Sequence, residues 1–438
     1  MSKPSVAPAS GTRDFLPADM QRRLDAFRIV RAAFEQHGFL PFDTPCFERL
    51  ETLTGKYGDE GEKLIFKILK RGEALDRAED GELADMALRY DLTVPTMRAV
   101  TANRHKLPRI FKRYQMAPVW RADRPGKGRF REFYQCDVDI VGSPSTLADI
   151  EVLSAMTAAI AGLNFTGYEI RLNSRKVLKG MMTAYDVPEA LHGGAVTALD
   201  KLDKIGIDKL PEEFATQGLP PEVATPLVAD LARADFAALL ADKLAALPTG
   251  AAGLAEVAEI VGALGDRLVG GSIRFDPLLA RGLDYYTGAI FEFVTPAYGG
   301  SIAGGGRYDG LTKLFGGKEE PVCGGSLGIE RILMLTEQAT TEVAGPTAYV
   351  TVWDADARTT ALDLVRAIRA AGASAEVDLV GGKIGGQMKL AAERHCRFAL
   401  IQGPDDRAAG VVQVKALGTG EQTAVPLAEV PGFLVSGT

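Results

Sequence analysis

The stretch Phe111–Gly142, FKRYQMAPVWRADRPGKGRFREFYQCDVDIVG, decides the fold of this chain. It contains two segments of β character joined by a turn with Pro125, Gly126 and Gly128, so we predict a β-hairpin. Successive side chains of a strand point to opposite faces. The return strand therefore has an apolar face, expected to meet a core: Tyr134, Cys136, Val138 and Ile140. Its other face is mostly polar: Arg131, Phe133, Gln135, Asp137 and Asp139.

The charges of this hairpin indicate the kind of ligand that it suits. Arg121 shares a face of the outgoing strand with Ala117 and Val119. The turn adds three further cations, namely Arg124, Lys127 and Arg129. Cations near the tip and carboxylates near the base suit a ligand with a phosphate end and a cationic end. From this stretch alone, a solvated hairpin of mixed charge is the alternative interpretation.

The composition narrows the class of protein. The 438 residues suffice for two or three domains. The contents of 46% hydrophobic and 24% charged residues are ordinary for a soluble globular protein. Because the net charge is −7, any contact with nucleic acid must use local basic patches. The four cysteines and four histidines are scattered without disulfide or metal-site spacing, which favours a reducing compartment. Without a secretory signal or a membrane-spanning run, a cytoplasmic protein with no membrane partner is expected.

The N-terminal region predicts a helix followed by an edge strand. After GTRDFLP, Gly11–Pro17, a helix is expected over about 18–37, and Gly38 would end it. Apolar residues recur there at helical spacing: Met20, Leu24, Phe27 and Phe34. The extended segment that follows carries Pro41 and Pro45, which favour the edge of a sheet. Helix and strand could pair with a second copy of the chain, or the helix could simply be buried.

The segment MALRYDLTVPTMR, which begins at Met86, reads as a strand in which apolar residues alternate with Arg89, Asp91 and Thr93. Thr93 can cap a helix that opens before Pro95. A carboxylate and a hydroxyl at the end of a strand suit contact with a small molecule, although a plain helix cap also explains Thr93.

The rest of the chain contains a helical insertion and a terminal α/β unit. A helix is expected over 143–163 and a strand ending at Asn173, followed by an Ala- and Leu-rich stretch over about 175–265 with prolines at its turns. Beyond VAGPTA, a linker around Pro346, strands and helices alternate in a compact unit. This unit ends at FLVSGT without an obvious last helix.

Three glycine-rich blocks lie between the insertion and the linker. Glycines around Arg281 and around Arg307 suggest close approach of the backbone to a ligand. Neither block has the spacing of a Rossmann or P-loop motif. GGSLGIERILMLTEQ predicts a strand, a glycine turn and a helix whose first turn carries Glu330 and Arg331, and this arginine could reach into a cleft.

Together these blocks resemble the catalytic domain of class II aminoacyl-tRNA synthetases, and within that class the histidyl-tRNA synthetase family. RGLDYY, Arg281–Tyr286, and GGRYDG, Gly305–Gly310, look like the two histidine-specific signatures. The hairpin resembles the second class motif, Gly324–Arg331 the third, and the helix and strand ending at Pro45 the first, the dimer motif. The resemblance implies an α+β fold with an antiparallel-sheet catalytic domain, a helical insertion and a C-terminal α/β anticodon-binding domain. The implied bounds are 1–174 and 266–338 for the catalytic domain, 175–265 for the insertion, and 346–438 for the anticodon-binding domain.

The resemblance also implies a reaction. A homodimer would join L-histidine and ATP into histidyl-adenylate with release of pyrophosphate, then transfer histidine to the 3′-terminal ribose of histidine tRNA. Arg121 and Arg281 would be catalytic, at the α-phosphate. The other ATP contacts would be Arg129, Phe133 and Arg331, the last two on either side of the adenine. The histidine contacts would be Asp91, Thr93, Gln135, Asp139, Tyr285, Tyr286 and Tyr308. Mg²⁺ would enter with ATP, so no metal site built by the protein alone is expected.

Some positions depart from the common bacterial pattern of that family. Asp91 and Asp139 stand where many bacterial members have Glu, and Gly126 stands at the hairpin tip where many have Gln. Two other functions are alternatives: a non-catalytic synthetase-like regulatory subunit of histidine biosynthesis, and a tRNA-binding or stress-sensing module. The presence of Arg121, Arg281 and the whole terminal unit weighs against both.

Overall fold

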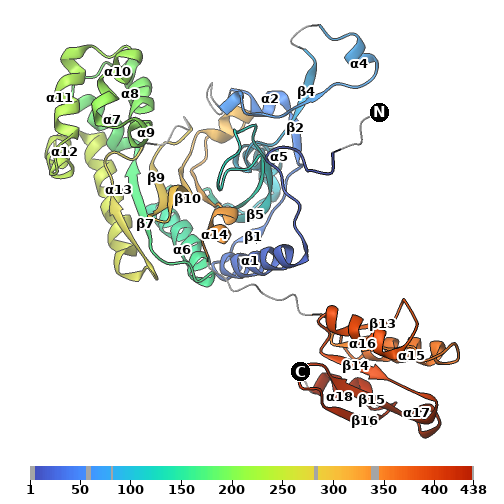
Figure 1. Cartoon of the computed structure of the whole chain (residues 1–438). Coiled ribbons are helices and arrows are strands. Elements are labelled where there is room, and N and C mark those ends of the chain that lie inside the picture. The colour runs from blue at the N-terminus through green and yellow to red at the C-terminus, as the bar shows by residue number, and fades with distance from the viewer. Residues whose placement is uncertain (1–4, 56–60, 80–81, 281–284, 337–344, 437–438) are drawn as a thin grey trace. The chain divides into compact units, whose positions relative to one another are not determined.

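The computed structural model describes residues 5–55, 61–79, 82–280, 285–336 and 345–436. Contacts divide the chain into two compact units, one of Met1–Phe15 with Arg22–Gln338 and the other of Leu16–Gln21 with Ala339–Thr438. The predicted α+β class is confirmed, because a mixed, largely antiparallel sheet lies among helices in the first unit (Figure 1).

The first unit is built on an eight-stranded sheet with the order β1-β5-β6-β11-β10-β9-β7-β8. Neighbouring strands are antiparallel except for the two edge pairs, β1 with β5 and β7 with β8. The strands are β1 (Leu40–Pro41), β5 (Phe111–Trp120), β6 (Glu132–Val141), β7 (Tyr168–Ser174), β8 (Gly271–Phe275), β9 (Ala289–Thr295), β10 (Tyr298–Arg307) and β11 (Val322–Leu327).

The predicted hairpin is formed by β5 and β6, with Ala117 opposite Gln135 and Val119 opposite Phe133. Its apolar face is buried as expected: Cys136, Val138 and Ile140 pack into a core that also contains residues of α1 (Pro17–Gln36) and α6 (Thr146–Gly162). α6 begins later than predicted because the Ser145 side chain caps it, accepting from the backbone N–H of Leu147 at 3.2 Å. Burial of one face fixes the register, since a slip of one residue would expose these apolar side chains.

Helix α1 has the predicted extent, but its predicted apolar stripe is partly wrong. Met20 and Leu24 are 36% and 47% exposed, whereas Ala26, Val30 and Phe34 are buried. At 3.6 residues per turn, the first two side chains lie beside the face that the buried three define. An exposed apolar edge of α1 therefore accompanies the edge strand β1, where Leu40 is also exposed.

The expected strand through Thr93 is shorter than predicted. β4 (Ala84–Leu88) pairs with β2 (Phe47–Arg49) and β3 (Lys67–Leu69), near the short helices α2 (Leu50–Leu53) and α4 (Glu73–Asp76). Arg89 does not belong to a polar face: it is 1% exposed and donates to the carbonyls of Pro118 and Thr44. The cap of α5 (Thr93–Asn103) is also not Thr93, because Asp91 Oδ1 accepts from the Val94 N–H at 3.1 Å.

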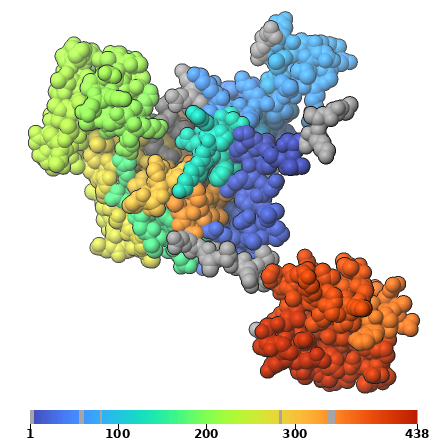
Figure 2. Space-filling model, in the orientation of Figure 1, coloured from blue at the N-terminus to red at the C-terminus, as the bar shows by residue number. Residues whose placement is uncertain are grey.

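The stretch 175–265 is helical as expected, and three of its helices, α10, α11 and α13, begin at or next to prolines. The helices are α7 (Arg175–Ala184), α8 (His192–Asp200), α9 (Leu202–Ile205), α10 (Leu210–Thr216), α11 (Pro221–Leu231), α12 (Phe236–Leu244) and α13 (Pro248–Leu264). In the space-filling view this lobe and the β3–β4 ribbon project separately from the body of the unit (Figure 2). Among the described residues, no helix is both long and apolar enough to cross a membrane.

The second unit is a five-stranded mixed sheet, ordered β13-β12-β14-β15-β16, with helices beside it. The expectation that it lacks a last helix is wrong, because α18 ends the unit and buries Val430 and Leu434 in its core. The sequence did not predict this helix because it contains Pro431 and Gly432, and both residue types are poor helix formers. The elements are β12 (Ala348–Val350), α15 (Ala357–Ala370), β13 (Ala375–Val377), α16 (Ile384–Glu393), β14 (Phe398–Ile401), α17 (Pro404–Ala409), β15 (Val411–Ala416), β16 (Gln422–Pro426) and α18 (Val430–Ser436).

Candidate active site

Two adjacent cavities lie over the polar face of the hairpin. The larger encloses about 830 Å³ and the smaller about 200 Å³. Both are lined by Arg121, Gln135 and Ser326, so the residue after β5 and the strands β6 and β11 supply a common wall. A ligand with two chemically different ends could therefore lie across the wall with Arg121 at its middle.

The larger cavity gathers every residue for which a histidine contact was expected. These side chains come from the β4–α5 turn, from β6 and from the segments before β9 and after β10: Asp91, Thr93, Gln135, Asp139, Tyr285, Tyr286 and Tyr308. The three tyrosine rings form one cluster, with centroids 4.9 to 6.3 Å apart. The cavity thus combines carboxylates, an amide and an aromatic wall.

The smaller cavity gathers the expected nucleotide contacts Arg121, Arg129, Phe133 and Arg331. Arg331 stands in the first turn of α14 (Ile329–Leu335) and donates to the carbonyls of Ser301 at 2.6 Å and Gly128 at 3.1 Å. These bonds hold the guanidinium in the cavity, as predicted for this helix. Arg281, the second expected catalytic residue, lies outside the described residues.

Arg121 is held between aromatic rings at the boundary of the two cavities. Its Nε donates to the Tyr90 carbonyl at 3.0 Å, and its guanidinium carbon lies 4.2 Å from the Tyr90 ring centroid and 5.3 Å from that of Phe133. Cation–π contacts and one hydrogen bond orient the group. A fixed guanidinium of this kind can stabilise charge that develops on a phosphate.

The floor of the larger cavity contains one buried charge that the sequence interpretation missed, that of Arg113. Asp139 accepts a hydrogen bond from the Tyr308 hydroxyl and forms an ion pair with Arg113, which is fully buried. Asp137 lines the same floor, and burial, with a further contribution from Asp139, raises its pKa to about 7 against the opposing effect of Arg113. Alternate residues of a strand share a face, and counting back in steps of two from Arg121 along β5 leads to Arg113. This count would have placed Arg113 on the polar face of the hairpin.

Two of the three glycine-rich blocks, the one before Arg307 and the one that begins at Gly324, lie largely in paired strands. Gly304, Gly305 and Gly306 of β10 stand opposite Ser326, Gly325 and Gly324 of β11. A Cβ at Gly324 would collide with the carboxylate of Asp139 and with the Tyr308 hydroxyl, 2.8 Å away. Glycine is therefore needed here because the floor of the cavity passes directly over the backbone.

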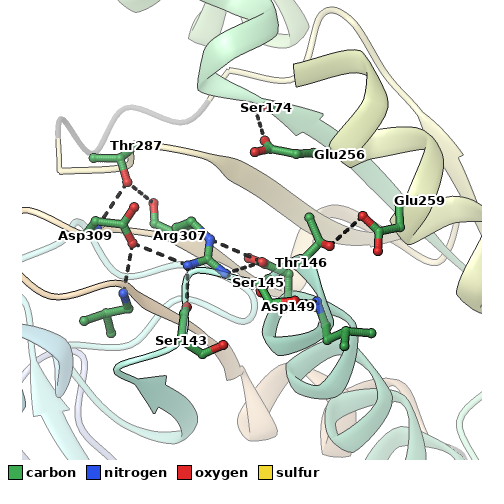
Figure 3. A network of polar contacts seen from close by, with 12 residues as sticks. Ser143, Ser145, Thr146, Asp149, Ser174, Glu256, Glu259, Thr287, Arg307 and Asp309 are labelled. Carbon is green, nitrogen blue, oxygen red and sulfur yellow. Dashed lines mark hydrogen bonds and ion pairs between the residues drawn. The ribbon is translucent and has the colours of Figure 1, made fainter. Parts of the chain in front are cut away.

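A network of polar contacts around Arg307, the residue before Tyr308, joins the end of β10 to the start of α6 (Figure 3). Arg307 donates to the carbonyls of Ser143 at 2.9 Å and Ser145 at 3.0 Å, and it pairs with the buried Asp149 of α6. Its own carbonyl accepts from the Thr287 N–H at 2.8 Å, which ties in the segment that carries Tyr285 and Tyr286. The start of α6 and the backbone at Thr287 are thus both fixed to one residue, Arg307, which directly precedes Tyr308.

The N-terminal block GTRDFLP also belongs to the site. Arg13 donates to Glu330 at 2.7 Å and lies 3.4 Å over the Phe130 ring, while the Gly11 carbonyl accepts from the Arg131 N–H at 2.8 Å. Glu330 also pairs with the buried Arg23. The block therefore fastens the hairpin to the helix that carries Arg331, a role with no local signal in the sequence.

Similarity to known proteins agrees with this geometry. A model of the family described as histidyl-tRNA synthetase matches residues 11–332, and one described as anticodon binding domain matches residues 345–436. Proteins named histidine–tRNA ligase are 38% identical in Gloeobacter violaceus, over 98% of this chain and 97% of that protein, and 40% identical in Cytophaga hutchinsonii, over 99% and 100%. The solved histidyl-tRNA synthetase from Nostoc sp. PCC 7120 superposes with a TM-score of 0.77 at 28% identity, covering all of both chains.

These matches define the class and then the family. The fold is that of an aminoacyl-tRNA synthetase catalytic domain followed by an anticodon-binding domain, as the sequence predicted. The chain belongs to the histidyl-tRNA synthetase family.

Replacing Gly324 with Ala should damage the larger cavity. The new methyl group would displace Asp139, which cannot yield freely because Arg113 and Tyr308 hold it. We expect a loss of about 1–3 kcal/mol in the free energy of unfolding and histidine binding weakened at least tenfold, measured by urea unfolding and by calorimetry. Gly262→Ala is the control, because no atom lies within 4 Å of that added Cβ on α13. Unchanged histidine affinity in Gly324→Ala would contradict the tight packing.

Replacing Asp149 with Asn should weaken histidine binding from a distance. Removal of one buried partner leaves the Arg307 charge uncompensated, at a cost of about 3–5 kcal/mol in unfolding free energy, and frees the Tyr308 segment. We expect the KM for histidine in pyrophosphate exchange to rise roughly 10–100-fold while the KM for ATP stays near that of the unmodified protein. Asp235→Asn, which breaks the exposed pair with Arg233, should change neither constant. Equal increases in both constants would show that the network is merely structural.

Proposed function

We propose that the chain ligates L-histidine to histidine tRNA in two steps, an ATP-dependent formation of histidyl-adenylate and a transfer to the 3′-terminal ribose. Family membership supports this reaction. The observation that carries it is the common wall of the two cavities, because Arg121 stands where an amino acid in one cavity would meet a nucleotide in the other.

In the first step the histidine carboxylate would attack the α-phosphate of ATP. The nucleophile is already ionised, so the chief obstacle is repulsion between two negatively charged groups, not removal of a proton. Arg121, fixed by Tyr90 and Phe133, would stabilise the charge on the crowded phosphate as pyrophosphate leaves. We propose the same role for Arg281.

The smaller cavity would hold the nucleotide. Phe133 and Arg331 line it together, and an adenine between them would gain both ring stacking and cation–π attraction. Arg129 lies at the same cavity and suits the phosphates. Magnesium would arrive with ATP as part of the substrate. Among the described residues no cluster of His, Cys, Asp or Glu is arranged to hold a metal, and Glu330 is engaged by Arg13 and Arg23.

The larger cavity would hold the amino acid. Asp91 and Thr93 at the start of α5 would take the α-amino group, with Gln135 beside them. Asp139 would accept from the imidazole; Tyr308 donates to this carboxylate, so the tyrosine positions the acid instead of meeting the ring itself. Tyr285 and Tyr286 would cover the ring faces. Because buried polar partners would be left unpaired by other side chains, the cavity would reject most analogues.

In the second step the tRNA would be held by both units. We propose the domain bounds 1–174 and 266–338 for catalysis, 175–265 for the insertion and 346–438 for binding the anticodon. We also propose a homodimer that covers the exposed Met20, Leu24 and Leu40 of α1 and β1. Since charged tRNA is consumed in translation, the cytoplasm is the proposed location.

A regulatory subunit without catalysis is the competing function. It would need neither Arg121 at a cavity wall nor an anticodon-binding unit, and this chain has both. Histidine-dependent exchange of pyrophosphate into ATP separates the two proposals, because only the ligase forms the adenylate. A folded dimer with magnesium that supports no exchange would favour the regulatory function.

Replacing Arg121 with Ala should abolish most of the adenylate formation. Loss of one fixed cation at the phosphate is expected to lower the exchange rate about 10²-fold or more, with little effect on histidine affinity. Arg77→Ala, which removes an exposed arginine directly after α4, is the matched control and should exchange at the normal rate. Exchange by Arg121→Ala within a few-fold of normal would remove this residue from the mechanism.

Deleting residues 346–438 should separate the two steps. The first unit has its own cores, so it is expected to fold and to keep exchange activity within a few-fold. Charging of histidine tRNA should fall by at least about 10²-fold because the anticodon contacts are lost. Parallel measurement of exchange and charging tests this, and equal losses of both would contradict the division of labour.

A further inference from the structure

Tyr298 is an aromatic residue beside the two cavities to which the proposed reaction assigns no role. It begins β10, where the register with β9 shifts between Tyr298 and Ala303. Irregularities of this kind re-aim side chains next to functional sites. Here the side chain reaches the turn of the β5–β6 hairpin, residues 121–131, where its hydroxyl donates to the carbonyl of Lys127 at 3.4 Å. The ring thus joins two segments that are far apart in the sequence.

Two glycines leave the space that the Tyr298 ring occupies. A Cβ added at Gly128 of the hairpin turn would lie 2.9 Å from the hydroxyl oxygen of the ring and 3.1 Å from Cε2. A Cβ added at Gly300 would lie 3.1 Å from Cε1, which is on the opposite edge of the ring. Gly128 is itself buried, although its neighbours Lys127 and Arg129 are exposed. The ring therefore fits closely between two segments of backbone, and a side chain at either glycine would press on it.

The same ring contacts Arg331, which lines the smaller cavity. The guanidinium carbon of Arg331 lies 5.5 Å from the Tyr298 ring centroid, within the range of a cation–π attraction. Arg331 also donates to the carbonyls of Gly128 and Ser301. Gly128 packs against the ring, and Ser301 follows Gly300, which packs against its other edge. Tyr298 therefore supports Arg331 directly and through the two segments whose carbonyls hold it.

Arg331 needs such support because it stands among other cations. Burial lowers the pKa of its guanidinium, and so do the neighbouring charges of Arg129 and Arg121. Tyr298 and Asp123 act in the opposite direction. Since all three arginines line the smaller cavity, their mutual repulsion opposes this arrangement until a negatively charged nucleotide is bound.

Resting on the function proposed above, we propose that Tyr298 is a positioning residue for ATP, which fastens the hairpin turn to β10 and holds Arg331 at the smaller cavity before the nucleotide binds. Tyr298 is not among the described residues that line this cavity, so it acts through Arg331 and the turn. A site ordered in advance binds more tightly because less conformational freedom is lost on binding.

Histidine binding should not depend on this contact. Tyr298 lines the larger cavity, but it begins β10, whereas Gly306 and Tyr308 lie at and just beyond the other end of that strand. The residues proposed to bind histidine gather at that other end, beside Tyr308 and Asp139. The two substrates should therefore respond differently to a change at Tyr298.

Pyrophosphate exchange by variants of the full chain tests the proposal. Tyr298→Ala should raise the KM for ATP at least about tenfold, while the KM for histidine stays within about threefold of that of the unmodified protein. Tyr298→Phe should stay within about threefold for both substrates, because the ring remains and the lost hydrogen bond is long. Phe433→Ala, which removes a partly exposed ring from α18 of the second unit, is the control and should change neither constant.

Limited proteolysis without ligand gives a second readout, which does not depend on the reaction. Trypsin can cut the hairpin turn after Lys127 and Arg129, which are exposed on either side of the buried Gly128. In Tyr298→Ala, cleavage in this turn should be at least about fivefold faster, with unchanged cleavage elsewhere, because the turn opens locally. Mass spectrometry identifies the sites. Tyr298→Phe and Phe433→Ala should be cut in the turn at the rate of the unmodified protein.

Three outcomes would overturn this role for Tyr298. The first is an equal rise of both KM values in Tyr298→Ala, as expected of a purely structural residue. The second is an unchanged KM for ATP, or an unchanged rate of cleavage in the turn, in that variant. The third is a Tyr298→Phe variant as defective as Tyr298→Ala, which would assign the effect to the hydroxyl. If the unmodified protein itself supported no exchange, the proposed function would fail, whereas the cleavage rates would still decide whether Tyr298 holds the turn.

Discussion

The ion pair between Arg113 and Asp139 is the interaction on which the site depends. Both groups are buried, on the neighbouring strands β5 and β6, where neither charge could remain without the other. Asp139 is in turn held by Tyr308, which the network around Arg307 and Asp149 fixes in place. The larger cavity is therefore organised from its floor upward, by groups that are largely buried beneath its surface.

Strand geometry then determines what each face can do. One face of β6 builds the core with α1 and α6, and the other presents a row from Phe133 to Asp139 that crosses from one cavity to the next. The glycines of β10 and β11 have no side chains that would fill the cavity, so a ligand can approach the backbone of these strands. Chemistry along the row changes from aromatic to amide to acid without any change of secondary structure.

Much of the secondary structure could be predicted from the sequence because it follows from local periodicity. The hairpin faces, the extent of α1, the helical stretch 175–265 and the first turn of α14 all followed from alternation, helical spacing and glycine or proline signals. The identity of the site residues came from resemblance to a family, not from periodicity. The features that the sequence did not predict depend on tertiary contacts. Arg89 and Arg113 are buried inside the protein, and no local sequence pattern distinguishes a buried arginine from a solvent-exposed one. The contact of Arg13 with Glu330 joins residues 317 positions apart, beyond any local signal.

The anchoring of residues 11–13 has a practical consequence for handling the protein. Gly11 packs against Arg131 and Pro125, and Arg13 reaches both Phe130 and Glu330, so the leading segment supports the hairpin tip and the α14 helix together. An affinity tag joined directly before Gly11 would replace Ser10, whose carbonyl accepts a hydrogen bond from Arg131 of the hairpin. A fusion design should keep a spacer ahead of this glycine, and assays of tagged and cleaved preparations should not be pooled.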